Sequence, residues 1–113
     1  MNKAIGIVEM YGFVTAIAAA DAAAKAADVK IIAIDTNKPA NAEAVEVPLI
    51  TAIKIQGEVS AVKAAVEAAK EIANAVSGVI CSHVISGPTE DTQTMAERIS
   101  VGRDIVGQIK NNA

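Results

Sequence analysis

The sequence predicts an α+β domain of the ferredoxin-like class, with two helices on one face of an antiparallel four-stranded sheet. Two observations support this prediction. A strand–helix–strand pattern occurs twice along the chain, and each helix is rich in alanine while the strands are rich in β-branched residues. The resulting order of elements, βαββαβ, is that of the ferredoxin-like motif. The 113 residues are enough for one such domain and a C-terminal extension.

The first unit begins with a strand from Ala4 to Glu9. A glycine turn at Gly12 then leads into a helix from Thr15 to Ala27, and a β-branched strand follows from Val29 to Ile34. Alanine has the highest helix propensity. Apolar residues recur at helical spacing and predict a shallow buried stripe on this helix: Ile17, Ala20, Ala24 and Ala27.

The second unit repeats this order with a strand from Thr51 to Ile55, a helix from Ser60 to Val76 and a strand from Val79 to Ile85. Ser60 is the expected N-cap of the helix. The helix has a clearer apolar face than the first one, formed by Val62, Val66, Ala69, Ala73 and Val76. In the first strand, Gly6 indicates that another element approaches closely, and we expect that element to be a helix.

Composition limits how the domain can be stabilised. Hydrophobic residues make up 52% of the chain but aromatic residues only 2%, so the core must consist of Ala, Val and Ile. Tyr11 and Phe13 are the only aromatic residues, and we expect them to fill the end of the core, with an interface anchor as the alternative. The apolar content exceeds what one small core needs, which favours association with copies of the same chain.

Several functional classes are disfavoured. A net charge of −3 and a pI near 5.0 provide no basic surface for nucleic acid. One cysteine cannot form an internal disulfide, so we expect a reducing, intracellular setting. The chain has no apolar run long enough to span a membrane, and residues 1–3 lead into a strand without the features of a signal peptide.

The sequence also gives no sign of catalysis or of a cofactor. It contains no phosphate-binding loop and no dinucleotide-binding glycine motif. Cys81 and His83 alternate on the last strand and so point to the same side, but a metal site needs about three or four ligands. We therefore predict no metal site within one chain, and instead a buried free cysteine beside a hydrogen-bonded histidine. A metal site shared between subunits is the alternative.

Several segments together resemble one family, the bacterial microcompartment shell domain. They are Ala4–Met10, Gly12, Ala19–Val29, Val62–Ala65 after Gly57, and Val79–Ile85 with Pro88 beyond. The resemblance implies a shell domain at residues 1–88 in the usual order of elements. It implies a cytoplasmic shell subunit that forms hexamers, which tile with one another and with other shell proteins around enclosed enzymes. Small metabolites would pass through a pore on the six-fold axis.

Two sites follow from this resemblance. Lys25 matches the lysine at the edge between neighbouring hexamers, although a lone lysine on an alanine-rich helix also simply keeps the outer face hydrated. The connection between the second and third strands matches the pore loop. Here it lacks the usual glycines and runs from Asp35 to Ile50, and its candidate pore residues are Asp35, Thr36, Asn37, Lys38, Pro39, Ala40, Asn41, Glu43 and Glu46.

The sequence leaves the course of this loop open. It either narrows or reshapes the pore or runs away from the axis. The family often carries an edge arginine near the position of Ser86–Pro88, and it is missing here, which favours a departure from the flat six-fold ring. Because the ferredoxin-like fold also occurs in effector-binding domains, an oligomeric small-molecule sensor is the alternative function.

Residues 89–113 are expected to form an amphipathic C-terminal helix that begins at Thr89. Its apolar stripe would consist of Met95, Ile99, Gly102, Val106 and Ile109. This helix would dock on its own sheet or on a neighbouring subunit. The long loop and this helix resemble variant shell proteins linked to glycyl-radical-enzyme compartments, including choline-degrading ones.

Overall fold

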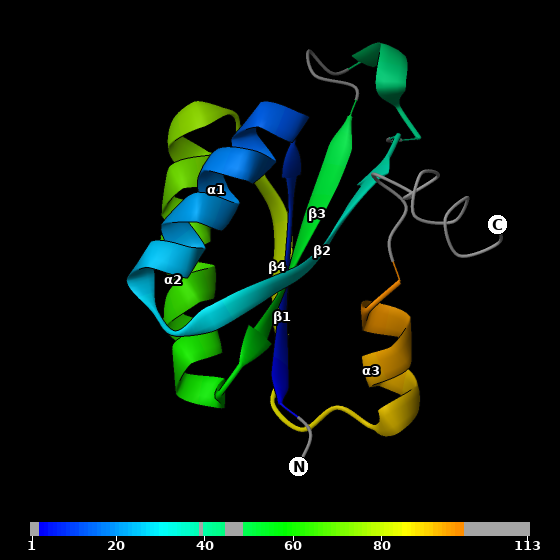
Figure 1. Ribbon diagram of the computed structural model, residues 1–113. Helices are drawn as coiled ribbons and strands as arrows, with labels where there is room; N and C mark the ends of the chain where they lie inside the picture. The colour runs from blue at the N-terminus through cyan, green and yellow to red at the C-terminus, as the bar shows by residue number, and fades with distance from the viewer. Residues whose placement is uncertain (1–2, 39, 45–48, 99–113) are drawn as a thin grey trace, which may run out of the picture.

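The computed structural model describes residues 3–38, 40–44 and 49–98. It contains a four-stranded sheet and three α-helices (Figure 1). In chain order the elements are β1 (Ala4–Tyr11), α1 (Phe13–Ala26), β2 (Val29–Asn37), a turn of 3-10 helix (Ala42–Ala44), β3 (Ile50–Gly57), α2 (Val59–Val76), β4 (Val79–Ile85) and α3 (Glu90–Ala96). The α+β, βαββαβ prediction is confirmed.

The strands are antiparallel and lie in the order β2-β3-β1-β4. β1 and β3 are therefore central, while β2 and β4 form the edges. The sequence prediction ended the second strand too early, because Asp35, Thr36 and Asn37 belong to β2 and pair with Ala52, Thr51 and Ile50 of β3. The connection between these strands is consequently shorter than expected, from Lys38 to Leu49.

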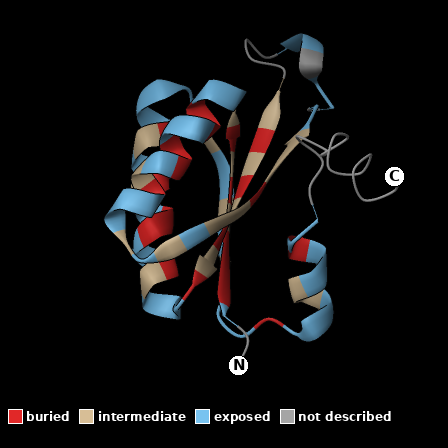
Figure 2. Cartoon of the chain, in the orientation of Figure 1, coloured by how far each residue is buried: buried red, intermediate tan, exposed pale blue. Residues whose placement is uncertain are grey.

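The helices lie on both sides of the sheet. α1 and α2 cover one face, and α3 lies on the opposite face, which we call the far face (Figure 1). Burial follows the same division, since the buried positions of α1 and α2 face the sheet whereas α3 is mostly exposed (Figure 2). Among the described residues, no helix has the length and apolarity needed to cross a bilayer.

The main core lies between the sheet and the α1–α2 layer. Its largest fully buried members include Val8 and Met10 of β1, Ile53 and Ile55 of β3, and Val62 of α2. Gly6 explains how α2 comes so close: a Cβ atom at this position would lie 2.6 Å from Val66 Cγ2 and 2.8 Å from Val62 Cγ1. The prediction of a helix close to Gly6 is therefore confirmed.

The buried face of α1 differs from the predicted stripe. Ile17 is 47% exposed and Ala24 is also exposed. The buried positions are Thr15, Ala16, Ala19, Ala20 and Ala23. On α2 the predicted face is correct except that Val76, at the end of the helix, is 61% exposed. Ala65, which the prediction left out, is buried on the same face.

Of the buried aliphatic residues, three are not part of the main core: Ile5 of β1, Ala33 of β2 and Ala96 of α3. Ile5 alternates with Gly6 and so points to the far face, where α3 lies. Thr89 is the N-cap of α3 as predicted, and its hydroxyl accepts a hydrogen bond from the Thr92 backbone N–H at 3.2 Å. By contrast, the N-cap of α2 is Glu58 and not Ser60.

Candidate functional site

Lys25 lies in the last turn of α1, on its solvent-facing side. Its side chain is 77% exposed, and its Nζ lies 2.8 Å from Oδ2 of Asp21, one helical turn earlier. The hydrogen bond to Asp21, together with the charge of that carboxylate, raises the pKa of the Lys25 ammonium. Lys25 is thus positively charged and available on the outer surface. The prediction did not use Asp21, although its i,i+4 spacing from Lys25 is visible in the sequence.

The candidate pore residues divide into two groups. Asp35, Thr36 and Asn37 are part of β2, as described above, and are not loop residues. Lys38, Ala40, Asn41 and Glu43 lie in the exposed connection beyond the sheet. Pro39 and Glu46 fall outside the described residues.

The base of this connection is fixed by backbone hydrogen bonds. The Gly12 N–H donates to the Leu49 carbonyl at 2.9 Å, and the Tyr11 N–H donates to the Gly78 carbonyl at 3.3 Å. Gly12 has φ of 93°, a conformation that favours glycine, and it joins β1 to α1. The start of α1, the end of the connection and the start of β4 therefore meet at one end of the sheet.

Asp35 makes an ion pair with Lys54, its neighbour on β3, on the far face. Both side chains are largely shielded, with 24% exposure for Asp35 and 13% for Lys54. Lys54 Nζ also donates to the Arg98 carbonyl at 2.9 Å. The charge of Asp35 is therefore compensated within the sheet, and it cannot serve as a free pore carboxylate as the sequence suggested.

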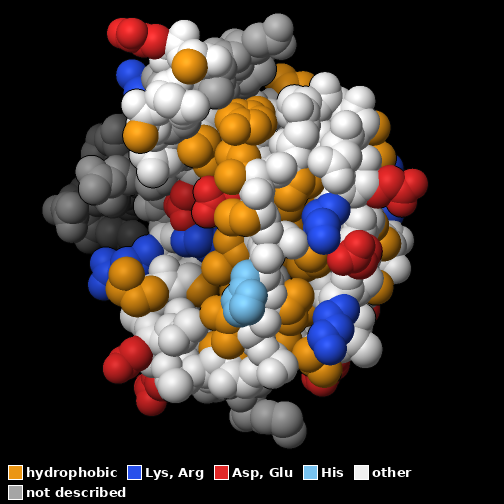
Figure 3. Space-filling model, turned by 180° about the vertical axis from the view of Figure 1, so that it is seen from behind, with side chains coloured by type: hydrophobic (Ala, Val, Ile, Leu, Met, Phe, Trp, Pro, Cys, Tyr) orange, Lys and Arg blue, Asp and Glu red, His pale blue; other side chains and the backbone are white. Residues whose placement is uncertain are grey.

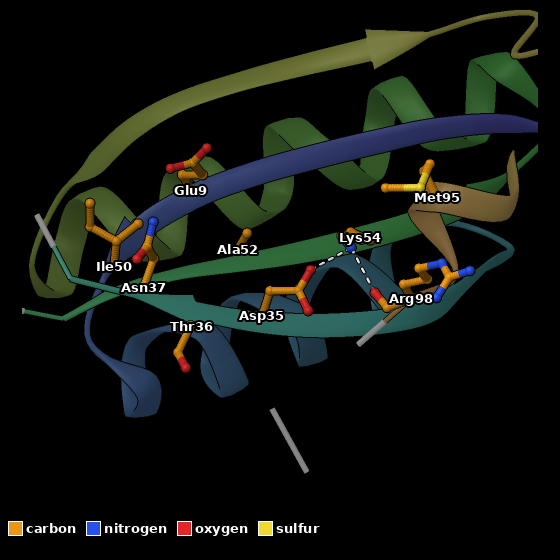
Figure 4. Close-up of a pocket in the computed structure, with 9 residues that line it drawn as sticks. All are labelled: Glu9, Asp35, Thr36, Asn37, Ile50, Ala52, Lys54, Met95 and Arg98. Carbon is orange, nitrogen blue, oxygen red and sulfur yellow. Dashed lines mark hydrogen bonds and ion pairs between the residues drawn. The ribbon is translucent and has the colours of Figure 1, made fainter. Parts of the chain in front are cut away.

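This ion pair lies in a groove of about 450 Å³ between the sheet and α3, which we call the far-face groove. Figure 4 shows Glu9, Asn37 and Ile50 at one end, Ala52 and the ion pair in the middle, and Met95 and Arg98 at the other end. The walls thus combine apolar side chains with two carboxylates and two cations. The sequence analysis did not find this groove, because its residues come from four separate elements.

Cys81 and His83 point to the same side of β4 as expected, but both are exposed, so the prediction of a buried cysteine is wrong for the single chain. Partial burial, and then the charge of Glu9 and a hydrogen bond to it, raise the pKa of the Cys81 thiol. Among residues 3–38, 40–44 and 49–98, no three His, Cys, Asp or Glu side chains lie close enough together to hold a metal ion.

The prediction that the two aromatic residues fill the end of the core is wrong. Tyr11 is half-buried, whereas Phe13 is 40% exposed at the start of α1. The side of the molecule seen in Figure 3 has a band of hydrophobic side chains. The large hydrophobic residues that the described chain exposes are Phe13, Val14, Ile17, Val59, Val76, Ile80 and Met95.

Comparison with known proteins gives a consistent result. Residues 4–88 match the family model described as the BMC domain. Carboxysome shell protein CcmK2 of Synechocystis is 35% identical over 95 residues, which cover 82% of this chain and 84% of the relative. Bacterial microcompartment shell protein PduA of Salmonella typhimurium is 37% identical over 92 residues, covering 81% of this chain and 88% of the relative.

Two longer proteins are also similar. Bacterial microcompartment shell protein EutK of Salmonella typhimurium is 33% identical, and the match covers 82% of this chain but only 51% of EutK. The crystal structure of a microcompartment protein from Desulfitobacterium hafniense superposes with a TM-score of 0.66 at 25% identity. That match covers 88% of this chain and 49% of the other chain.

Proposed function

This chain belongs to the BMC-domain family of bacterial microcompartment shell proteins, and we propose that six copies form a ring and that such rings pack edge to edge into a shell. Its role is that of a structural shell subunit. We also propose that the chain has no catalytic activity. The type of compartment and the enclosed enzymes stay predictions.

The observation that carries the ring proposal is the exposed apolar surface of the single chain. Phe13, Val14 and Ile17 lie on the first turns of α1, and Val14 is 80% exposed. Val76 and Ile80 are exposed close to the point where α2 passes into β4. The Ser77 hydroxyl donates to the Tyr11 carbonyl at 2.6 Å, so the end of α2 lies beside the start of α1. The two sets of exposed apolar residues are therefore at the same end of the molecule. An apolar surface of this kind supports burial between neighbouring copies.

For the edge between rings, we propose Lys25. Its exposure and its position off the buried side of α1 leave it free to contact another ring without disturbing the fold. The pairing with Asp21 holds its side chain along the helix surface, which places both charges where an adjoining ring could meet them.

For the pore, we propose the connection between β2 and β3, represented among the described residues by Lys38, Ala40, Asn41 and Glu43. In this proposal the pore does not have the glycine-lined form expected of common family members. Since Asp35 is paired with Lys54, the acidic character of the pore depends on fewer carboxylates per copy than the sequence alone suggests.

Electron microscopy of the purified chain, combined with light scattering, tests the ring proposal. We expect particles of six times the 11.5 kDa chain mass, together with sheets or tubes that form without any ligand. A stable monomer at high concentration would contradict the proposal. A small oligomer that assembles only after binding a metabolite would instead support the sensor alternative.

A further inference from the structure

The far-face groove lies where the described part of the chain ends. Arg98 lines the groove, and its carbonyl accepts a hydrogen bond from Lys54 Nζ at 2.9 Å. Lys54 is itself held by the ion pair with Asp35 (Figure 4). The point from which residues 99–113 continue is therefore attached to the sheet by one hydrogen bond, from a lysine that the ion pair holds in place.

The groove also exposes apolar side chains and a carboxylate that a further segment of the chain could cover. Met95 is 64% exposed at one end, and Ile50 and Ala52 are only partly buried on the sheet. Glu9 lines the same groove, and none of the described cations lies within ion-pair distance of it. An apolar surface next to a carboxylate suits a segment that combines aliphatic and basic side chains.

Residues 99–113 have this composition. Ile99, Val106 and Ile109 continue the apolar spacing that begins at Met95, and the basic residues Arg103 and Lys110 lie between or beside them with Asp104 as the only acidic residue. In helical form the segment would span roughly 20 Å at about 1.5 Å per residue. The eight residues of β3 span about 26 Å, so the segment in helical form is comparable in length to the strand that forms the floor of the groove.

We propose that residues 99–113 dock in the far-face groove of their own chain, with their aliphatic side chains on Ile50, Ala52 and Met95 and a basic side chain at Glu9. The α1–α2 layer and this segment would then cover opposite faces of one sheet. The proposal concerns the single chain and does not depend on ring formation.

Cross-linking in the full-length chain tests the proposal. The chain has one cysteine, so Cys81→Ser gives a background without thiols. Into this background we would introduce Ala52→Cys on the groove floor and Val106→Cys in the segment, and treat the protein with a short bis-maleimide. The matched control pair is Lys63→Cys with Val106→Cys, because Lys63 is exposed on α2, on the opposite side of the sheet.

We expect the Ala52–Val106 pair to link within one chain, at a yield on the order of tenfold above the control pair, because docking raises the effective concentration of the two thiols. Denaturing electrophoresis separates this product from linked dimers. Predominantly dimeric product would show that a neighbouring copy fills the groove and would overturn the proposal. Equal yields for the two pairs, or no link in either, would overturn it as well.

A second measurement uses substitutions in the segment alone. Val106→Asp with Ile109→Asp would place charges against the groove, and we expect a lower midpoint of urea unfolding for the full-length chain. Asn111→Asp with Asn112→Asp adds the same charge outside the apolar stripe and should leave the midpoint unchanged. An equal midpoint for both double variants would contradict docking through the aliphatic side chains.

Discussion

On β3, Thr51, Ile53 and Ile55 face the two long helices and are fully buried, whereas Ala52 and Lys54, between them in sequence, face α3 and are only partly buried. The two faces of the sheet thus come from alternate residues of the same strands. The α1–α2 face consists of aliphatic side chains packed against alanine-rich helices. The far face carries a groove and an ion pair.

The difference shows two ways of fixing a helix to a sheet. α2 is fixed by shape, because Gly6 allows Val62 and Val66 to lie where a Cβ atom would otherwise be. α3 buries Ala96 and is followed directly by the Lys54–Arg98 hydrogen bond, so polar contacts carry much of its attachment. We expect substitutions on the first face to change stability strongly and those on the far face to have smaller effects.

The largest effect is expected for Ile53→Ala. Ile53 is fully buried in the main core, and a cavity at such a site costs about 2–5 kcal/mol of the free energy of unfolding. The matched variant Ile50→Ala removes the same atoms from a half-buried position at the groove and should cost less than half as much. Urea unfolding measures both values. Equal losses in the free energy of unfolding would show that the two faces of the sheet contribute equally to stability, and would contradict the expected difference between them.

Gly6→Ala is expected to cost about 1–3 kcal/mol, because the added methyl group meets two β-branched side chains with little rotamer freedom. Gly87→Ala is the control, since a Cβ atom there has no neighbour within 4 Å. If the clash is the cause, adding Val66→Ala should cost less in the Gly6→Ala background than in the native one. Additive effects in this double-mutant cycle would argue against the close contact.

Lys54→Met should destabilise the chain by about 1 kcal/mol, because it removes a largely shielded ion pair with Asp35 and a hydrogen bond to the Arg98 carbonyl. Asp35→Asn in the same background tests whether the pair is responsible, and the combined variant should lose less than the sum of the single losses. The free energies come from urea unfolding at low and high salt. A coupling energy of zero would show that the pair does not hold the far face together.

The smallest effect on stability is expected for Lys25→Ala, with no measurable change in the midpoint of urea unfolding, because the side chain is exposed. The same substitution should abolish sheets or tubes while leaving single rings intact, since a tiled array repeats each edge contact many times. Asp21→Asn keeps the lysine and serves as the control for losing the local pair. Normal sheets from Lys25→Ala, seen by electron microscopy, would remove Lys25 from the edge.

The fold could be predicted because its signals are local and repeated. The two strand–helix–strand units follow from spacing within about ten residues, and Gly6 and Thr89 indicated a close approach and a helix start correctly. The buried face of α1 could not be predicted in the same way. Because eight of the fourteen residues of α1 are alanine, hydrophobicity distinguishes its faces poorly. The helix packs closely through its alanines, and the larger Ile17 lies on the exposed side.

The site was harder to predict because it depends on pairing between distant residues. Asp35 and Asn37 are typical turn formers, yet the ladder with β3 keeps both in the sheet, and Asp35 also forms the ion pair with Lys54. No local pattern connects Asp35 with Lys54 or Lys54 with Arg98. The exposure of Lys25, by contrast, depends only on its position on a helix and could be predicted from the sequence alone.

The hydrogen bond between Gly12 and Leu49 has a practical consequence for protein engineering. The pairing of Asn37 with Ile50 closes the connection between β2 and β3 at its base, and the Gly12–Leu49 hydrogen bond ties the end of the connection to the start of α1, so a longer connection should leave the geometry of the sheet unchanged. Each doubling of a flexible loop costs only about 0.6 kcal/mol of closure entropy. A foreign peptide inserted between Ala40 and Asn41, both exposed, should therefore leave the domain folded. In an assembled shell, such an insertion would display one copy of the peptide for every subunit.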